Sequence, residues 1–243
     1  MKRTGACLVF IVFFLIWPSL PAAADDPRVV VEGLLVAEGL DPKKISSLLL
    51  DSRVSVRPEI VLKNLFFSKP KGSGRNPEVM EIDPRQIEQG RKFMKENEAV
   101  LSAVQERFGA SPRIITSILI VESRLGTYPM PYNVFNAYAN LAFVLDPVYW
   151  KEIQNRYGDA YPEIRSEATA ARAKKKAKWA VRELYYLSQI ADHLETDPLS
   201  LSGSFAGAMG PAQFIPSSFW IFGLDGNGDG MADPSNMSDA AFS

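Results

Sequence analysis

The sequence predicts a mainly helical protein, and three observations support this fold class. Apolar residues recur every three or four positions along most of the chain. Asp-Pro and Ser-Pro pairs at 41–42, 83–84 and 111–112 are typical of a helix cap followed by the first helical residue. No stretch alternates apolar and polar residues in the manner of a strand. With 243 residues, of which 47% are hydrophobic and 23% charged, the chain can form one large domain or two small ones with apolar cores.

The expected elements follow in chain order. We predict helices over residues 29–39, 41–50, 83–109, 111–126, 133–145, 163–196 and 211–222, the segment 163–196 being one long helix or two in series. Pro, Gly, Ser and Lys predict a loop over residues 69–83, and the polar segment 225–236 predicts another. Within 163–196, the basic run 172–178 is interpreted as a solvated helix face.

The first 24 residues predict a signal peptide for export. Lys2 and Arg3 precede an apolar run over residues 6–17 that is short for a membrane span, and Ala22 to Ala24 provide small residues for cleavage. An uncleaved membrane anchor is the alternative. Because Cys7 is the single cysteine, the mature chain would have none and would depend on packing alone. We expect a periplasmic or secreted protein.

The scarce residue types exclude several classes of site. Without cysteine, the mature chain has no thiol nucleophile and no zinc or iron–sulfur site built on cysteine. The single histidine, His193, excludes sites with two histidines, and we place it near a helix end as a terminus-stabilising residue. Lys and Arg number 27 against 28 Asp and Glu, so no bulk charge favours nucleic acid. If the protein is an enzyme, its acid/base chemistry belongs to carboxylates.

Glu122 is the first candidate catalytic residue. It lies four residues after Ile118 in a segment so rich in isoleucine that we expect the whole helix to be buried. Gly126 marks the end of this helix one turn later. Burial and the negative end of the helix dipole would raise the pKa of the carboxyl, as a general acid requires. The alternative is a structural salt bridge to Arg124 or to another arginine.

The second candidate is the glycine-rich segment 203–218. Glycines at 203, 207 and 210 permit close backbone approach and positive φ angles. Ser204 and Gln213 are neutral hydrogen-bonding residues that suit sugar hydroxyls or an acetamido group. The alternative is a tight connection between helices.

The third candidate is a calcium loop that starts at Asp225. Oxygen-bearing side chains stand at loop positions 1, 3, 5 and 9, with glycine at position 6 (Asp225, Asn227, Asp229, Asp233 and Gly230). Position 12 is Asn236 instead of the usual glutamate, and Asp239 could replace it if the loop is longer. The alternative is a turn without metal.

Taken together, four segments resemble the lytic murein transglycosylases of the membrane-bound B type and their soluble forms. The segments are Val-Glu-Ser-Arg-Leu-Gly at 121–126, residues 136–143, residues 197–218 and the acidic loop from Asp225. The resemblance runs from about Asp83 to the end of the sequence. It implies a lysozyme-like helical core beside an additional helical domain. We therefore expect an N-terminal helical segment over 25–82 and a transglycosylase domain over 83–243.

The resemblance also implies an activity and its residues. Members cleave the β-1,4 bond between N-acetylmuramic acid and N-acetylglucosamine in peptidoglycan and leave 1,6-anhydromuramyl ends. Glu122 corresponds to the single acid/base, and Ser204 and Gln213 correspond to polar residues of the active site. The corresponding ligands of a structural Ca²⁺ are Asp225, Asn227, Asp229, the Met231 carbonyl and Asp239. The expected partner is the peptidoglycan glycan strand, with no nucleic acid and no membrane span after signal cleavage.

Two departures from the family pattern concern the limits of the chain. The family places an aromatic residue of the active-site floor in a helix beyond the calcium loop, which this sequence does not reach, and residues 69–82 lack a tyrosine that the family often has. We therefore expect a member truncated at its C-terminus or a fragment of a longer gene. The competing interpretation is a non-catalytic module that binds peptidoglycan or assembles the cell wall on the same core.

Overall fold

The structure is a computed structural model that describes residues 26–67 and 83–243. The predicted signal peptide at 1–24 and nearly all of the predicted loop at 69–83 lie outside the described residues. Within the described ranges, none of the helices combines the length and the apolar composition that crossing a bilayer requires.

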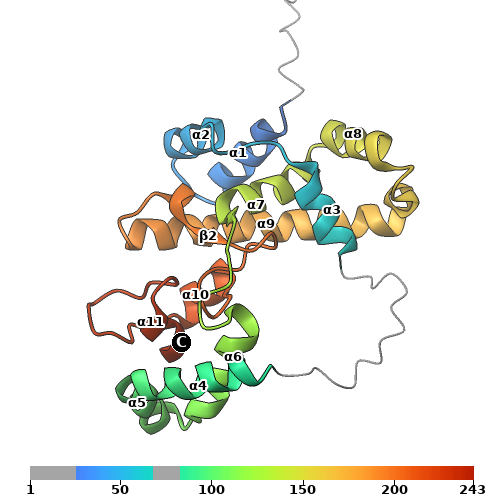
Figure 1. Ribbon diagram of the computed structural model, residues 1–243. Helices are drawn as coiled ribbons and strands as arrows, with labels where there is room; N and C mark the ends of the chain where they lie inside the picture. Colours follow the sequence, from blue (N-terminus) through green and yellow to red (C-terminus); the bar gives the residue numbers. More distant parts are fainter. Residues whose placement is uncertain (1–25, 68–82) are drawn as a thin grey trace, which may run out of the picture.

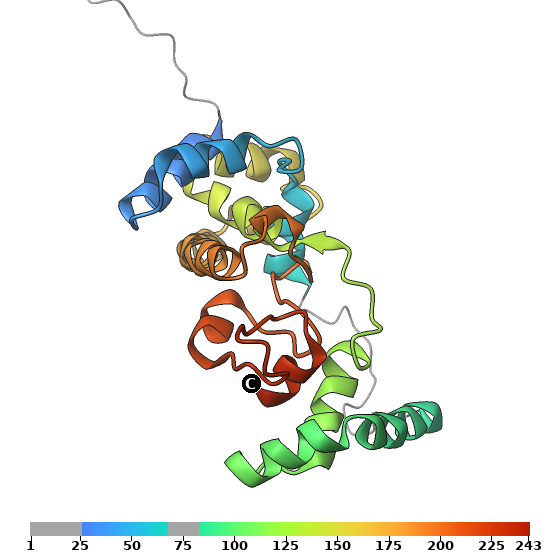
Figure 2. The ribbon, with the colours of Figure 1, turned by 90° about the vertical axis from the view of Figure 1, so that its left-hand side faces the viewer.

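The described part of the chain is mainly helical, as predicted. Its helices are α1 (Pro27–Ala37), α2 (Pro42–Leu50), α3 (Pro58–Phe66), α4 (Pro84–Glu96), α5 (Glu98–Phe108), α6 (Pro112–Ser123), α7 (Val134–Ala142), α8 (Pro147–Tyr157), α9 (Glu167–His193), α10 (Pro216–Phe222) and α11 (Met237–Phe242). Two short strands, β1 (Tyr132–Asn133) and β2 (Ser202–Gly203), pair antiparallel. In Figures 1 and 2, α1, α2, α3, α7, α8 and α9 gather at one end of the molecule, and α4, α5 and α6 lie at the other.

Aspartate caps explain where several helices begin. The side chains of Asp26, Asp41 and Asp83 accept hydrogen bonds from backbone N–H groups two or three residues further on, and proline follows each of them. Proline suits the first helical position because its missing N–H would have no helical partner there. The caps predicted at Asp41 and Asp83 are thereby confirmed.

The main core forms around α7, which is buried along its whole length. The 27-residue helix α9 passes beside it (Figure 1) and presents Ala173, Ala177 and Ala180, all buried, on its inner face. Small side chains let the two helix backbones approach closely, so that Phe135 and Tyr138 of α7 are fully enclosed. Apolar residues of α1, α2 and α3 belong to the same core. The N-terminal helices therefore pack on α7 and α9.

Some helices differ from the prediction. The single helix expected over 83–109 is two helices, because the backbone of Asn97 leaves the helical region with φ −115° and ψ 26°. Helices α3 and α8 were not predicted, although Asp146 caps α8 through the N–H groups of Val148 and Tyr149. The last predicted helix begins only at Pro216, after a turn that contains Gln213.

The burial expected around α6 is wrong. Thr116, Leu119 and Ser123 are buried on the side where α6 contacts α4, α5 and α11. The opposite face is open, with Ile114, Ile118 and Val121 exposed by 62%, 52% and 65%. Glu122 is exposed as well. The apolar pattern of a helix marks the faces that can be buried, and only the neighbouring elements determine which of them are covered.

Candidate active site

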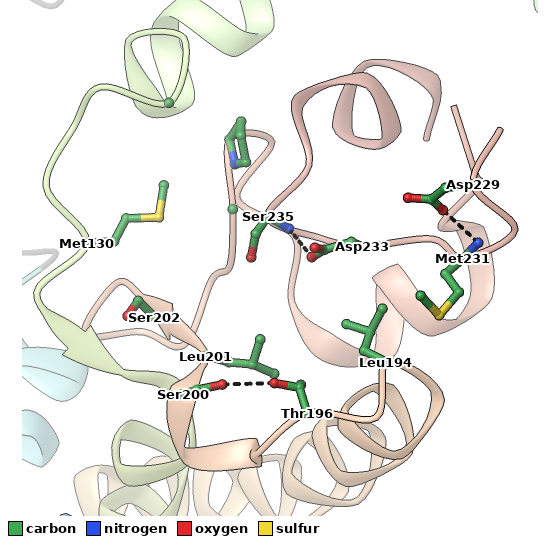
Figure 3. A pocket seen from close by; sticks show the side chains of 13 residues that line it. Met130, Leu194, Thr196, Ser200, Leu201, Ser202, Asp229, Met231, Asp233 and Ser235 are labelled. Carbon is green, nitrogen blue, oxygen red and sulfur yellow. Dashed lines mark hydrogen bonds between the residues drawn. The ribbon is translucent and has the colours of Figure 1, made fainter. Parts of the chain in front are cut away.

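Three segments that are far apart in the sequence meet at one cavity of about 560 Å³ (Figure 3). The connection after α6 contributes Gly126 and Met130, the glycine-rich segment contributes Gly210 and Pro211, and the acidic loop contributes Asp229, Met231, Asp233 and Ser235. The remaining lining residues belong to the segment from the residue after α9 to the start of β2: Leu194, Thr196, Ser200, Leu201 and Ser202. Each of the three segments singled out in the sequence therefore contributes residues to the lining of the same cavity.

The turn after Glu122 is tightly ordered. Arg124, Leu125 and Gly126 all adopt left-handed backbone conformations, with φ of 52°, 58° and 77°. The N–H of Leu125 donates to the Leu119 carbonyl at 2.9 Å, and the N–H of Gly126 donates to Oγ of the buried Ser123 at 2.8 Å. These bonds satisfy groups that a helix end leaves free. The turn leads the chain from the helix that carries Glu122 into the cavity wall.

Glu122 itself does not line this cavity, and its carboxyl forms no ion pair with another described residue. Arg124, the partner considered for a structural salt bridge, instead has its guanidinium 5.7 Å from the centre of the Tyr128 ring. The carboxyl therefore lies on the surface at the end of α6, one turn before a residue of the cavity.

Ser204 organises the first turn of the glycine-rich segment. Its Oγ accepts hydrogen bonds from the N–H groups of Ala206 and Ala208 at 3.2 and 3.1 Å. Gly207, with φ 87°, lies against the ring of Tyr138, whose hydroxyl donates to the Gly207 carbonyl at 3.0 Å. A Cβ at Gly207 would lie 2.2 Å from that ring, so only glycine fits there. The turn is thereby fixed to the core helix α7.

Gln213 connects the glycine-rich segment to the connection after α6. Its backbone has a φ of 55°, which is uncommon outside glycine. Its Nε2 donates to the Gly210 carbonyl at 3.0 Å and lies 3.8 Å from Sδ of Met130, which lines the cavity. Neither Gln213 nor Ser204 lines the cavity itself.

The acidic loop folds around two carboxylates. Asp225 accepts hydrogen bonds from the N–H groups of Gly228 and Gly230 at 2.6 and 2.7 Å. Asp239 is fully buried and accepts from the N–H groups of Gly226 and Asp233 at 2.9 and 2.8 Å. Asp239, three residues beyond the usual last ligand position, therefore points back into the loop from α11.

The middle of the loop favours negative charge. Hydrogen bonds from the Asn227 side chain and from the N–H of Met231 to the Asp229 carboxylate hold the pKa of Asp229 below its usual value. The oxygens of Asp225, Asn227, Asp229 and Asp239 are hard donors of the kind that Ca²⁺ prefers. Across 26–67 and 83–243, however, no three His, Cys, Asp or Glu side chains are grouped closely enough to hold a metal ion.

Sequence reasoning missed Glu183, a buried carboxylate of α9. It accepts hydrogen bonds from both the N–H and the hydroxyl of Ser217, at 2.8 and 2.9 Å. Ser217 stands in the first turn of α10, so Glu183 anchors the end of the segment that contains Gln213. The available signal was its position on the apolar face of the helix, three residues after Ala180 and four before Leu187.

The chain is similar to known proteins over most of its length. A family model described as the transglycosylase SLT domain matches residues 36–243. Membrane-bound lytic murein transglycosylase B of Escherichia coli K12 is 30% identical over 163 residues, which cover 67% of this chain and 37% of that protein. The chain thus spans little more than a third of the length of the curated relative that it matches.

Solved structures share the fold. Soluble lytic transglycosylase SltB1 from Pseudomonas aeruginosa is 26% identical with a TM-score of 0.66, and the match covers 89% of this chain and 63% of that one. The Escherichia coli lytic transglycosylase Slt35, solved in complex with calcium, is 26% identical with a TM-score of 0.67, and the match covers 91% of this chain and 61% of that one. The lysozyme-like helical fold inferred from the resemblance is therefore confirmed.

Proposed function

This chain belongs to the transglycosylase SLT domain family, and from that membership we propose that it cleaves the β-1,4 bond between N-acetylmuramic acid and N-acetylglucosamine in peptidoglycan. The observation that carries the proposal is the family match over residues 36–243. The segment after Glu122, the glycine-rich segment and the acidic loop also converge at one cavity, although Glu122, Ser204 and Gln213 do not line it.

In the proposed mechanism, Glu122 acts first as an acid and then as a base. Its neutral carboxyl donates a proton to the glycosidic oxygen while the bond from that oxygen to the anomeric carbon breaks, and the substrate's acetamido group stabilises the forming cation. The Glu122 carboxylate then takes the proton of the 6-hydroxyl of the same sugar while the oxygen of that hydroxyl bonds to the anomeric carbon. The product is a 1,6-anhydro end, and no water is consumed. Most glycosidases need a second carboxylate, but an intramolecular nucleophile has a high effective concentration.

The position of Glu122 gives a glycan access to its carboxyl, although the burial that we expected to favour the neutral form is absent. The carboxyl is exposed and unpaired among the described residues, so a glycan oxygen can reach it. A hydrogen bond from the Gly126 N–H to the buried Ser123 ties the end of α6 to the left-handed turn that follows it. An accessible acid on a hydrogen-bonded helix end suits proton transfer to a bound substrate.

We assign Ser204 and Gln213 to hydrogen bonding with the glycan. Oγ of Ser204 already accepts two backbone N–H groups, so its own O–H is the group that can donate to a sugar oxygen. Nε2 of Gln213 already donates to the Gly210 carbonyl, so its Oε1 is the atom that can accept from a sugar hydroxyl or an acetamido N–H.

We further propose that the acidic loop holds a structural Ca²⁺. The ligands would be the side chains of Asp225, Asn227, Asp229 and Asp239 together with the Met231 carbonyl, and the bound ion would join the two ends of the loop. The donor set is made of oxygens, and the related Slt35 has been solved in complex with calcium. To bind the ion, the carboxylates of Asp225 and Asp239 would give up hydrogen bonds from backbone N–H groups of the loop.

Export by the signal peptide at 1–24, a periplasmic or secreted location, and the division into segments 25–82 and 83–243 belong to the same proposal. A lytic transglycosylase must reach peptidoglycan, which lies outside the cytoplasm.

The decisive experiment is incubation with purified peptidoglycan sacculi. The parent chain should release anhydromuropeptides that mass spectrometry identifies, and Glu122→Gln should release none. Glu106→Gln is the matched control, because Glu106 is an exposed glutamate on the neighbouring helix α5. Binding to sacculi without release by the parent chain would instead support the non-catalytic peptidoglycan-binding module.

A further inference from the structure

One side of α9 carries a concentration of positive charge that the proposed mechanism does not use. A hollow of about 610 Å³ is lined by Arg172, Lys175, Lys176, Lys178, Trp179 and Arg182. We call this surface the basic face of α9. At a rise of about 1.5 Å per residue it extends over roughly 15 Å of the helix. The sequence alone led us to interpret the run as a solvated surface.

Two lysines of the basic face have no acidic partner among the described residues. Lys175 and Lys178 form no ion pair with any residue in the described ranges. The guanidinium of Arg182 is paired with the Glu183 carboxylate at 3.8 Å, and that carboxylate also accepts a hydrogen bond from the Ser217 hydroxyl. Like charges on neighbouring turns of a helix repel one another. An anionic partner that binds here would relieve this repulsion.

Two of the cations are held in place by neutral acceptors. Arg172 donates to the Leu65 carbonyl at 2.7 Å, and Lys176 donates to Oδ1 of Asn64 at 2.9 Å. Burial, and secondarily the charge of Arg172, lower the pKa of Lys176. These contacts order the floor of the hollow, while the exposed Lys175 and Lys178 reach outward from it.

The basic face is connected to the turn that contains Ser204. Asn64, which accepts from Lys176, donates from its Nδ2 to the carbonyl of Phe205 at 3.0 Å. Phe205 follows Ser204 directly. Nζ of Lys63 lies 5.9 Å from the centre of the Phe205 ring and adds a further cation on this side. Helix α3 contacts α9 and crosses it in Figure 1, so the bond from Asn64 to Phe205 places the turn of Ser204 beside the basic face of α9.

We propose that the basic face of α9 binds the carboxylate groups of the peptide stems of peptidoglycan while the glycan strand lies at Ser204. This inference rests on the proposed function. The stems branch from the muramic acid residues next to the bond that would be cleaved, and they carry several carboxylates. The long, flexible side chains of Lys175 and Lys178 suit carboxylates that have no single fixed geometry.

The same observations disfavour a membrane surface as the partner. Proteins that lie on a bilayer combine basic residues with exposed apolar side chains that insert between the lipids. Trp179, the aromatic residue of the basic face, is half-buried and packs edge-on against Tyr138 with ring centres 5.4 Å apart. It is therefore not available as an anchor.

The test measures binding separately from cleavage. All chains carry Glu122→Gln, and sedimentation with intact sacculi at low ionic strength compares Lys175→Gln/Lys178→Gln with Lys43→Gln/Lys95→Gln, which removes two exposed lysines elsewhere. We expect the first pair to weaken binding roughly three- to tenfold, as for two exposed charge contacts, and the second to leave it unchanged. Glycan strands freed of their stems by an amidase should bind all chains equally.

Three results would overturn the inference. The first is equal binding of both double variants to intact sacculi, and the second is a loss of binding by Lys175→Gln/Lys178→Gln that is as large on stem-free glycan as on intact sacculi. The third is capture by phosphatidylglycerol vesicles that depends on Lys175 and Lys178 while binding to sacculi does not. Loss of the proposed activity is a separate result. It would show as no anhydromuropeptide released by the chain with Glu122 intact, even though sacculus binding still depends on the two lysines.

Discussion

The Cα of Gly210 lies so close to Pro234 that a Cβ at this position would be 1.7 Å from the Pro234 carbonyl oxygen. Gly210 belongs to the glycine-rich segment and Pro234 to the acidic loop, so this contact joins two of the three segments around the cavity. Its φ of 62° adds a second requirement for glycine.

Gly210→Ala should therefore separate the two segments and destabilise the protein. The clash with backbone cannot be relieved by a side-chain rotation, and we expect a loss of about 2–4 kcal/mol in the free energy of unfolding measured with urea. Gly228→Ala is the matched control, because Gly228 also has a positive φ, 79°, but a Cβ there would have no other atom within 4 Å. Equal losses in the two variants would show that strain alone matters.

Glu183 should stabilise the protein mainly through Ser217. Glu183→Ala leaves both the N–H and the hydroxyl of Ser217 without their acceptor, and we expect a loss of about 2–3 kcal/mol in urea unfolding. Adding Ser217→Ala to this variant should cost less than it does in the parent, because the hydroxyl has already lost its partner. Strictly additive losses would mean that the two residues do not act together.

Calcium should raise the melting temperature of the parent chain. A ligand at about 100 times its dissociation constant adds about 2.7 kcal/mol to the stability of the state that binds it, and each kcal/mol raises the melting temperature by about 2–4 °C in a protein of this size. Asp225→Ala should remove the response, whereas Asp159→Ala, which changes an exposed aspartate outside the loop, should keep it. A melting curve that millimolar calcium leaves unchanged in the parent would remove the metal from the proposal.

Acid should destabilise the contact between Asp51 and Arg53. The guanidinium of Arg53, through its hydrogen bonds to the carboxylate, lowers the pKa of Asp51 to about 2 from 3.8. Because the pKa is lower in the folded state, this stabilisation is complete above about pH 3.8 and is lost as the pH falls towards 2. The fall in melting temperature between these values should be smaller in Asp51→Asn than in the parent.

Salt provides the control for this pH dependence. Both side chains are partly exposed, so high ionic strength should reduce the difference between Asp51→Asn and the parent. An identical acid response in the two chains at low salt would contradict the assignment.

Local signals in the sequence were sufficient for the helix starts at Asp41 and Asp83 and for the family. Asp41 and Asp83 cap helices because a short carboxylate reaches the N–H groups two or three residues ahead, whatever the rest of the chain does. The family is indicated by the motifs of four segments and by their order along the chain, and neither depends on contacts between the segments. The segments are 121–126, 136–143, 197–218 and the loop from Asp225.

Local signals failed wherever burial depends on a distant neighbour. The isoleucines of α6 predicted a buried helix, but the side that bears Ile118 and Val121 is open. Glu183 was overlooked because its partner, Ser217, is 34 positions away. Likewise, the link between the basic run in α9 and the turn of Ser204 passes through Asn64 of α3, which is more than 100 positions from either.

The amino-acid sequence by itself thus determined the helical class, the caps at Asp41 and Asp83 and the family, because each depends on neighbours along the chain. Only the tertiary structure decided that Glu122 is exposed, that Gly210 contacts Pro234, and that the cations of α9 adjoin the turn of Ser204. The last two relationships join residues that are distant in the chain, and the exposure of Glu122 depends on which face of α6 its neighbours leave uncovered, so none of the three can be deduced from adjacent residues.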